Sequence, residues 1–173
     1  MNRSTAGPAG SHFADASAAR AALEMALPMI ERAVPDKDVC GSGFLYIVIM
    51  DPGLRPGDAS FEDAVLLEHA VGDRSRWDAD YAAFARAKAR LSWLHGADSH
   101  CVQHERAHLL REGDSLLWGS VWLDGIVVAA SGAHMFFDEA FALAIAANLR
   151  AIAKQRHAAA RAKDALVAGG TRA

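Results

Sequence analysis

Cysteine is scarce in this sequence, which holds only Cys40 and Cys101 among its 173 residues. Small domains that depend on disulfide bonds carry several cysteine pairs, so this count excludes a disulfide scaffold. A single bridge between the two cysteines is left open as an alternative. Two free thiols in a reducing cytosol are the favoured interpretation.

The sequence also lacks a long hydrophobic run and an excess of one charge. Its longest apolar run, residues 44–50, is far shorter than the ~20 residues that a membrane-spanning helix needs. Residues 1–12 contain one arginine and no apolar core, so we do not expect a secretory signal there. A net charge of −3 favours neither nucleic acid nor an anionic membrane as a partner. We therefore expect a soluble, cytoplasmic protein.

The composition is that of an ordinary globular protein, with 52% hydrophobic and 23% charged residues. A chain of this length can bury a sizeable core as one domain. We expect this domain at residues 14–157. It would lie between a small, polar, disordered tail at 1–13 and an alanine- and glycine-rich tail at 158–173 that frays from the last helix.

The spacing of hydrophobic and turn-forming residues predicts three helices and four strands. The first helix, 17–34, is expected to start at Asp15 or Ser17 as its cap, and Pro28 is expected to kink or break it. The other predicted elements are strands at 44–50 and 61–71, a helix at 79–94 capped by Asp78 and ended by Gly96, a hairpin turning at Asp124 and Gly125, and a final helix at 138–157.

Two segments decide the predicted fold class. Residues 61–71 fit a strand or a short helix, and the turn before them favours a strand. Asp124 and Gly125, between two apolar runs, are the strongest hairpin signal in the chain. The resulting order is helix–strand–strand–helix–strand–strand–helix. It predicts an α+β domain whose antiparallel sheet is flanked by helices.

Three short motifs resemble those of one known family. Residues 48–53 read V-I-M-D-P-G, like a strand that ends in an aspartate and a glycine turn, and residues 85–89 carry a lysine–alanine pair. The closest match is S-G-A at 131–133 followed by D-E-A at 138–140. Together they resemble a divergent member of the GlcG/HbpS-like haem-binding family. The resemblance implies a profilin-like fold, haem or a related tetrapyrrole as ligand, and a homo-oligomer.

The candidate ligand site lies where the last predicted strand meets the final helix. His134 follows the strand end and precedes a helix N-terminus, whose N–H groups can bind an anionic ligand. His134 could act there as acid, base or ligand. The alternative is a loop histidine beside an Asp138 that only caps its helix. With the resemblance, the predicted ligand contacts are Ser131, Gly132, His134, Phe137 and Trp118.

Several aromatic residues could line a flat pocket for a planar ligand, or belong instead to the core or to an interface. They are Trp93, Trp118, Trp122, Phe136 and Phe137. Residues 135–137 are expected in a connecting segment, where exposure would be costly, and this favours packing against a ligand or a partner subunit. The strings W-L-H-G at 93–96 and W-L-D-G at 122–125 are alike. We interpret this similarity as chance.

His100, His104 and His108 recur every four residues, with Cys101 and Glu105 between them. On one helical face such side chains lie about 6 Å apart, so two of these imidazoles could hold a divalent metal. One of them could instead be an axial haem ligand. The alternative is a polar surface segment. The chain has neither H-E-x-x-H nor C-x-x-C-H, so a zincin and covalent haem are not supported.

These observations lead to two main hypotheses. The first is a small-ligand binding protein that takes haem or a related tetrapyrrole. The second is a cofactor-independent enzyme in which His134, Lys88, and Asp51 or Asp138 transfer protons on a small carboxylated or aromatic substrate. Lys88 is expected to lie along the sheet edge or to pair with a carboxylate such as that of Asp51, and a purely structural ion pair is equally well supported. An accessory subunit without a ligand is a third hypothesis.

Overall fold

The structure is a computed structural model that describes residues 9–162, 168 and 169. Two short 3-10 turns accompany the helices and strands, at Arg74–Arg76 and Ala107–Leu109. In chain order the helices and strands are α1 (Ala16–Ala33), β1 (Leu45–Met50), α2 (Phe61–Ala64), β2 (Val65–Val71), α3 (Tyr81–His95), α4 (Ser99–Glu105), β3 (Ser120–Leu123), β4 (Ile126–Ser131) and α5 (Met135–Arg161).

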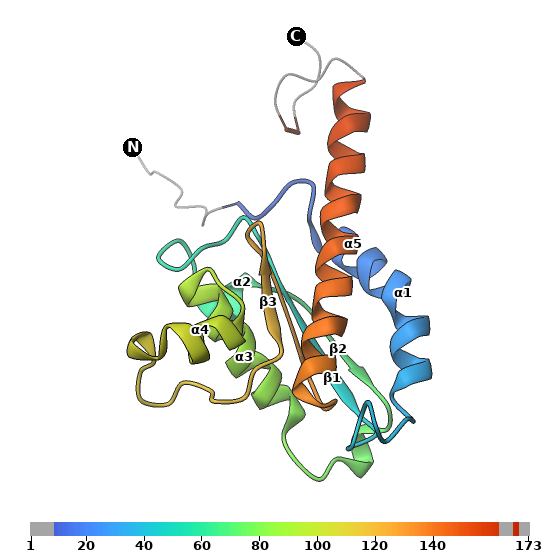
Figure 1. The fold of residues 1–173 in the computed structure, drawn as a ribbon. Coiled ribbons are helices and arrows are strands. Elements are labelled where there is room, and N and C mark those ends of the chain that lie inside the picture. Colours follow the sequence, from blue (N-terminus) through green and yellow to red (C-terminus); the bar gives the residue numbers. More distant parts are fainter. Residues whose placement is uncertain (1–8, 163–167, 170–173) are drawn as a thin grey trace.

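The four strands form one antiparallel sheet in the order β2-β1-β4-β3, with helices on both faces (Figure 1). Neighbours in this sheet are not always neighbours in the sequence, because β1 pairs with β4 through Tyr46 and Ser131. The two hairpins therefore lie side by side, and the start of β1 lies beside the end of β4. The predicted α+β class, antiparallel sheet and order of the long elements are confirmed.

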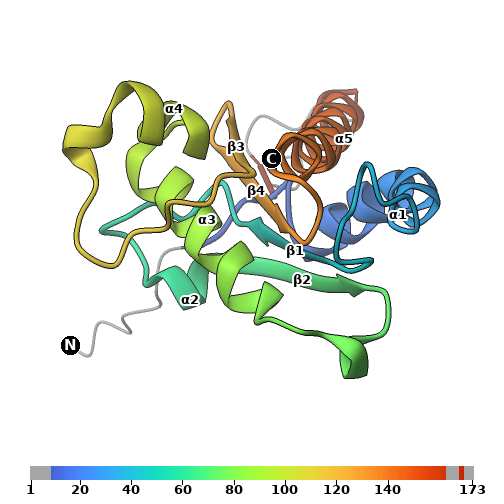
Figure 2. The same cartoon turned by 60° about the horizontal axis from the view of Figure 1, so that its bottom comes forward.

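The central strand β1 is buried on both faces because all six of its residues are apolar. Successive side chains of a strand point to opposite faces, so β1 contributes to two cores. One core contains Leu45, Ile47 and Ile49 with residues of α1 and α5. The other contains Tyr46, Val48 and Met50 with residues of α3. Figure 2 shows the same layers, with α1 and α5 on one face and α3 on the other.

The first helix begins as predicted, since Asp15 accepts a hydrogen bond from the N–H of Ala18 at 2.8 Å. The expected break at Pro28 does not occur, and α1 continues through this residue to Ala33. Pro28 deprives the carbonyl of Glu24 of its helical partner. Both residues are exposed, so water can satisfy that carbonyl.

The segment 61–71 is a strand only in part. Residues 61–64 form the short helix α2, and the strand assignment was wrong for them. Ser60 caps this helix, because its Oγ accepts the N–H of Asp63 at 3.0 Å and donates to the Asp63 carboxylate at 2.8 Å. Residues 65–71 form β2 and pair with β1 as predicted.

The cap of α3 also differs from the prediction. Asp80 accepts the N–H of Ala83 at 2.9 Å, whereas Asp78 accepts the hydroxyl proton of Tyr81 at 2.6 Å. The two aspartates are equally suited to capping and lie two residues apart. The end of the helix is as predicted, because Gly96 adopts a left-handed conformation with φ of 59°.

The final helix begins at Met135, earlier than the predicted residue 138, with His134 as its N-cap. Residues 135–137 are therefore its first turn, and the expectation of a connecting segment was wrong. Phe136 is nevertheless 70% exposed. The helix extends to Arg161, beyond the predicted domain limit at 157. Of the predicted C-terminal tail, residues 163–167 and 170–173 lie outside the described residues.

The described part of the predicted N-terminal tail has defined contacts with the domain. The N–H of Ser11 donates to Asp51 at 2.8 Å. The ring of Phe13 meets that of His157 edge-on, with centroids 5.6 Å apart. Residues 1–8 of this tail lie outside the described residues.

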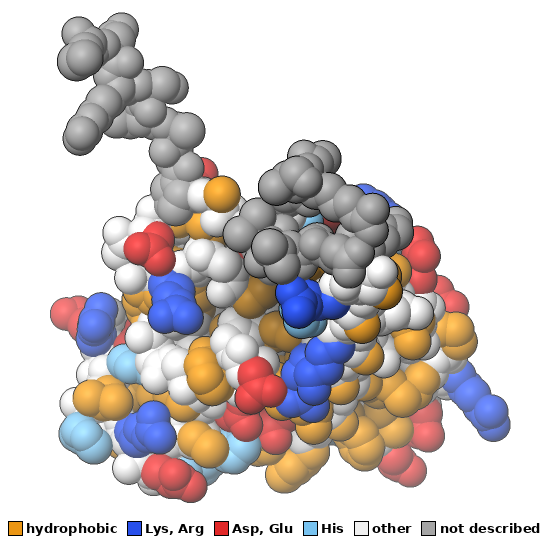
Figure 3. All heavy atoms as spheres, turned by 90° about the horizontal axis from the view of Figure 1, so that it is seen from above, with side chains coloured by type: hydrophobic (Ala, Val, Ile, Leu, Met, Phe, Trp, Pro, Cys, Tyr) orange, Lys and Arg blue, Asp and Glu red, His pale blue; other side chains and the backbone are white. Residues whose placement is uncertain are grey.

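The described residues include no helix that is both long and apolar enough to cross a membrane. On the end of the molecule seen in Figure 3, basic, acidic and hydrophobic side chains are interspersed.

Gly132 is required where β4 approaches β1. Its φ is 137°, and a Cβ atom there would lie 2.1 Å from the carbonyl oxygen of Phe44. We expect Gly132→Ala to lower the free energy of unfolding by about 2–4 kcal/mol, measured by urea denaturation. Gly113 also has a positive φ, of 87°, but among the described residues no atom beyond its two chain neighbours lies within 4 Å of its added Cβ. Gly113→Ala should therefore cost only about 1 kcal/mol. Equal losses would contradict the steric explanation.

Candidate functional site

Lys88 and Asp138 form a buried ion pair between α3 and α5. The Lys88 Nζ atom lies 2.8 Å from Oδ2 of Asp138 and donates a second hydrogen bond to the carbonyl oxygen of Ala130 at 3.0 Å. Oδ1 of Asp138 accepts the N–H of Ala133 at 2.9 Å. Asp138 thus lies inside its helix and is not the N-cap, and Lys88 pairs with it and not with Asp51.

The pair is closed to solvent, because Lys88 and Asp138 are each 1% exposed. Gly119 covers it closely, since a Cβ atom at this position would lie 2.5 Å from Cβ of Asp138 and 3.2 Å from Nζ of Lys88. Burial raises the pKa of Asp138 to about 6, although the charge of Lys88 opposes the shift. Burial likewise lowers the pKa of Lys88, opposed by Asp138. We interpret the pair as a structural connection, inaccessible to a substrate.

Asp51 lies away from this ion pair. It follows the last residue of β1, and its carboxylate accepts the N–H of Ser11. Lys88 contacts β4 at Ala130, which pairs with Ile47 of β1. At about 3.3 Å per residue, roughly 13 Å of strand separates this point from Asp51. Of the predicted acid–base residues, the structure therefore brings Lys88 and Asp138 together and leaves Asp51 apart from them.

The predicted ligand site around His134 consists mainly of structural contacts. His134 is exposed, and its Nε2 lies 3.3 Å from the carbonyl oxygen of Lys37. Ser131 is only 4% exposed. The carbonyl oxygen of Gly132 accepts the hydroxyl proton of Ser42 at 2.8 Å. These contacts close the end of the sheet where β4 leads into α5.

The three histidines of the 100–108 row do not share one helix. His100 and His104 lie on α4, which ends at Glu105, whereas His108 lies in the following 3-10 turn. The backbone leaves the helical conformation at Arg106, where φ is −129°. The predicted row on one helical face is therefore interrupted.

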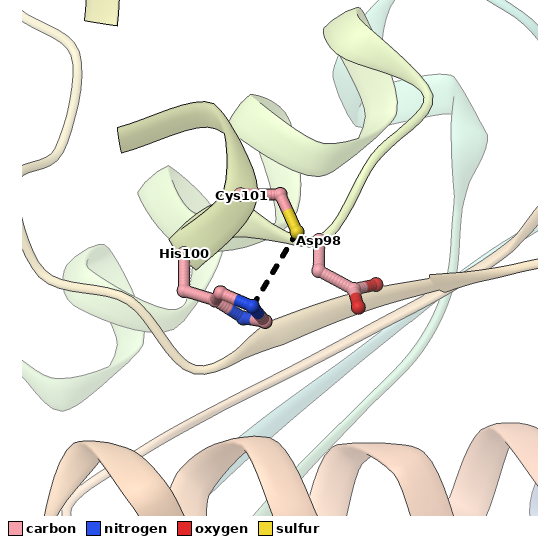
Figure 4. A group of neighbouring side chains, drawn as sticks. All are labelled: Asp98, His100 and Cys101. Atoms are coloured by element: carbon pink, nitrogen blue, oxygen red, sulfur yellow. Dashed lines mark hydrogen bonds between the residues drawn. The ribbon is translucent and has the colours of Figure 1, made fainter. Parts of the chain in front are cut away.

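A different group forms around His100. Asp98, His100 and Cys101 offer ligand atoms that all lie within 4.8 Å of one another (Figure 4). Nε2 of His100 is 3.4 Å from the Cys101 sulfur, and Nδ1 is 2.5 Å from Oε2 of Glu139 in α5. Burial raises the pKa of the Cys101 thiol, and the carboxylates of Glu105, Asp98 and Glu139 raise it further.

The predicted aromatic residues separate into two groups. Trp118 lies beside His100, with ring centroids 5.6 Å apart, and beside Phe136 at 5.2 Å, both edge-on. Phe137 follows Phe136 in the first turn of α5 and is 37% exposed. The other two tryptophans, Trp93 and Trp122, line a separate cleft.

This cleft has a volume of about 760 Å³ and lies between the end of α3, the β3–β4 turn and the segment that follows β1. All of W-L-H-G at 93–96 lines it, together with Trp122, Asp124 and Gly125 of W-L-D-G. Each string ends at a turn, and the fold brings both turns to the same cleft. The interpretation of the similarity as chance stays a prediction, and the two strings contribute residues to one cleft.

Three side chains give the cleft its chemistry. Trp93 is fixed in place because its Nε1–H donates to the carbonyl oxygen of Leu54 at 2.8 Å. Trp122 is 40% exposed. The Nε2 atom of His95 is buried and has no hydrogen-bond partner within the described part of the chain. Such an atom costs free energy unless it is satisfied, and a ligand in the cleft reaches it only after the His95 ring turns. Sequence reasoning did not identify His95.

A second cleft, of about 470 Å³, lies between α2, α3 and residues 111–115. Its basic and acidic residues are equal in number, so its charge favours neither an anion nor a cation. They are Arg86, Arg90 and Arg111 against Glu62, Glu112 and Asp114.

No protein-family model, no curated protein and no solved structure matches this chain. The GlcG/HbpS-like resemblance and the profilin-like label therefore stay predictions.

The ion pair can be tested by removing one charge and then both. We expect Lys88→Met to lower the free energy of unfolding by about 3–5 kcal/mol, because Asp138 remains as an uncompensated buried charge. Lys88→Met combined with Asp138→Leu should recover most of this loss, since no buried charge is left. Urea denaturation at neutral pH measures both. Losses that simply add in the double variant would contradict the coupling.

Proposed function

We propose that this protein binds a small planar ligand, of the class that includes haem and related tetrapyrroles, in the cleft at the end of α3. One observation carries the proposal. Two indole rings and an imidazole with an unpartnered nitrogen, those of Trp93, Trp122 and His95, line the same cleft.

The size and the walls of the cleft suit such a ligand. Its volume of about 760 Å³ falls within the range of small-molecule pockets, about 300–1,000 Å³. Indole faces stack favourably on flat conjugated rings. Arg55 also lines the cleft and can pair with an acidic substituent of the ligand, such as a carboxylate.

His95 is the residue in this cleft that suits a haem iron. Haem iron commonly takes one axial imidazole from the protein. None of the four histidines predicted from the sequence, at positions 100, 104, 108 and 134, is among the residues that line the cleft. We therefore keep the predicted ligand class and assign the axial contact to His95, whose ring must turn to present the buried Nε2 atom to the cleft.

Self-association is a second part of this proposal. Leu116 is 74% exposed, Phe136 is 70% exposed and Leu143 is 46% exposed. Phe136 and Leu143 lie seven residues apart on α5 and so share one face of this helix, and a patch of exposed apolar side chains supports contact with another protein surface. These residues are our candidates for the interface of a homo-oligomer.

The alternative of a cofactor-independent acid–base enzyme has weaker support. Lys88 and Asp138 are buried against each other, so neither can reach a substrate unless the start of α5 opens. Asp51 lies toward the other end of β1. No arrangement of these residues favours the enzyme over ligand binding.

Haem titration of the purified protein tests the proposal, followed by Soret absorption and by quenching of tryptophan fluorescence. We expect saturable binding of one haem per chain. Trp122→Ala should weaken it about tenfold, because losing a stacking face costs about 1.4 kcal/mol. His95→Ala should shift the Soret band. Iron-free protoporphyrin should bind with the same dependence on Trp122 and no dependence on His95.

Two matched variants serve as controls. Trp118→Ala removes an indole from the other aromatic group, and His134→Ala removes a histidine outside the cleft. Both should bind haem as the unmodified protein does. A loss in Trp118→Ala equal to that in Trp122→Ala would overturn the assignment of the cleft. Absence of saturable binding by either porphyrin would overturn the ligand class.

A further inference from the structure

We infer that Asp98, His100 and Cys101 form a binding site for a divalent transition metal of the zinc class, with Glu139 as the residue that positions His100. The site is distinct from the tryptophan-lined cleft and does not rest on the proposed function. It also differs from the histidine row expected from the sequence, because His104 and His108 do not belong to the group.

The donor atoms select the kind of metal. The group offers an imidazole nitrogen, a thiol sulfur and a carboxylate oxygen. Zinc binds all three kinds of ligand, whereas magnesium and calcium prefer oxygen alone. A cysteine ligand therefore favours zinc and the metals that resemble it.

The spacing of the donor atoms fits tetrahedral coordination. Bonds of about 2.0 Å to nitrogen and about 2.3 Å to sulfur, at the tetrahedral angle, place the two ligand atoms about 3.5 Å apart. Nε2 of His100 and the sulfur of Cys101 are 3.4 Å apart. One carboxylate oxygen of Asp98 accepts the N–H of Trp122 at 2.7 Å, which leaves the other oxygen to turn toward a metal.

Glu139 fixes which nitrogen of His100 is the ligand. Its Oε2 lies 2.5 Å from Nδ1, so the Nδ1–H group donates to the carboxylate and Nε2 keeps its lone pair. A carboxylate behind a histidine is the usual arrangement in zinc sites, where it orients the ring and strengthens it as a ligand. Glu139 belongs to α5, 39 residues beyond His100 in the chain.

The backbone of the site is held by buried contacts. The hydroxyl oxygen of Ser99 accepts the N–H groups of Gly119 and Ser120 at 3.1 and 3.0 Å. Ser99 and Val102 are both fully buried. The start of α4 is thereby fixed against β3, so the neighbouring donor residues are in place before a metal binds.

Charge favours a metal ligand over a reactive thiol. Cys101, His100 and Glu139 have the order of a nucleophile, a base and an orienting carboxylate. A reactive thiolate needs positive charge around it, whereas the carboxylates of Glu105, Asp98 and Glu139 act on Cys101, with Arg106 as an opposing cation. The same negative charges attract a dication, and a bound metal makes the thiolate favourable.

Three protein ligands leave one position of a tetrahedral metal free. Asp98, His100 and Cys101 are all partly exposed, so water can take that position. A fourth position occupied by water is the feature that distinguishes catalytic zinc sites from closed structural ones.

Titration of the metal-free protein with Co²⁺ tests the inference, because a cobalt–thiolate bond gives a charge-transfer absorption in the near ultraviolet. We expect one Co²⁺ per chain, displaced by Zn²⁺. Cys101→Ser should abolish the charge-transfer band, and His100→Ala should abolish or strongly weaken binding. Glu139→Gln should retain the band and weaken binding about 10–100-fold, as expected for a positioning residue.

His104→Ala, on the same helix, and Cys40→Ser, at the other thiol, are the controls and should leave the band unchanged. A band that persists in Cys101→Ser, or no band in the unmodified protein, would overturn the site. A second test needs no variants. We expect Zn²⁺ to protect Cys101 from alkylation by iodoacetamide, as measured by peptide mass spectrometry. Equal alkylation with and without zinc would also overturn it and would identify Cys101 as a free thiol.

Discussion

The contact on which the two helical layers depend is the ion pair of Lys88 and Asp138. α3 and α5 lie on opposite faces of the sheet, and the pair joins them beside Ala130 of β4. A buried charge is tolerated only with a partner. The helices α3 and α5 must therefore be placed so that Lys88 and Asp138 remain in contact. The two charges can meet there because Gly119 has no side chain to separate them. One charged contact thus constrains three elements together.

The two candidate sites share the edge strand β3 and the segment before it. Trp122 of this strand lines the cleft, and its backbone N–H donates to Asp98 of the proposed metal group. Trp118, just before the strand, contacts His100. A planar ligand and a metal would therefore bind next to the same strand. The buried hydroxyl of Ser99, which accepts two N–H groups from its start, holds this strand against α4.

The fold was predictable where local chemistry is decisive. The apolar run of β1, the turn at Asp124 and Gly125, and the capping aspartate at 15 each determine one element from a few adjacent residues. The errors lie where neighbouring residues compete for one role. Asp78 and Asp80 are both good caps, and tertiary packing decides between them. Residues 61–64 combine strand-like apolar residues with a Ser60 that starts a helical turn.

The sequence by itself determined the α+β class, the order of the long elements and the residue types that could carry chemistry. Only the tertiary structure decided which of those residues meet. Lys88 pairs with Asp138 and not with Asp51. His100 contacts Cys101 and Glu139 and not His108. Residues of the two W-L-x-G strings line one cleft only because the fold brings the end of α3 and the β3–β4 turn together. The physical reason is that these side-chain contacts depend on strand register and helix orientation. Both are set by contacts between residues far apart in the chain.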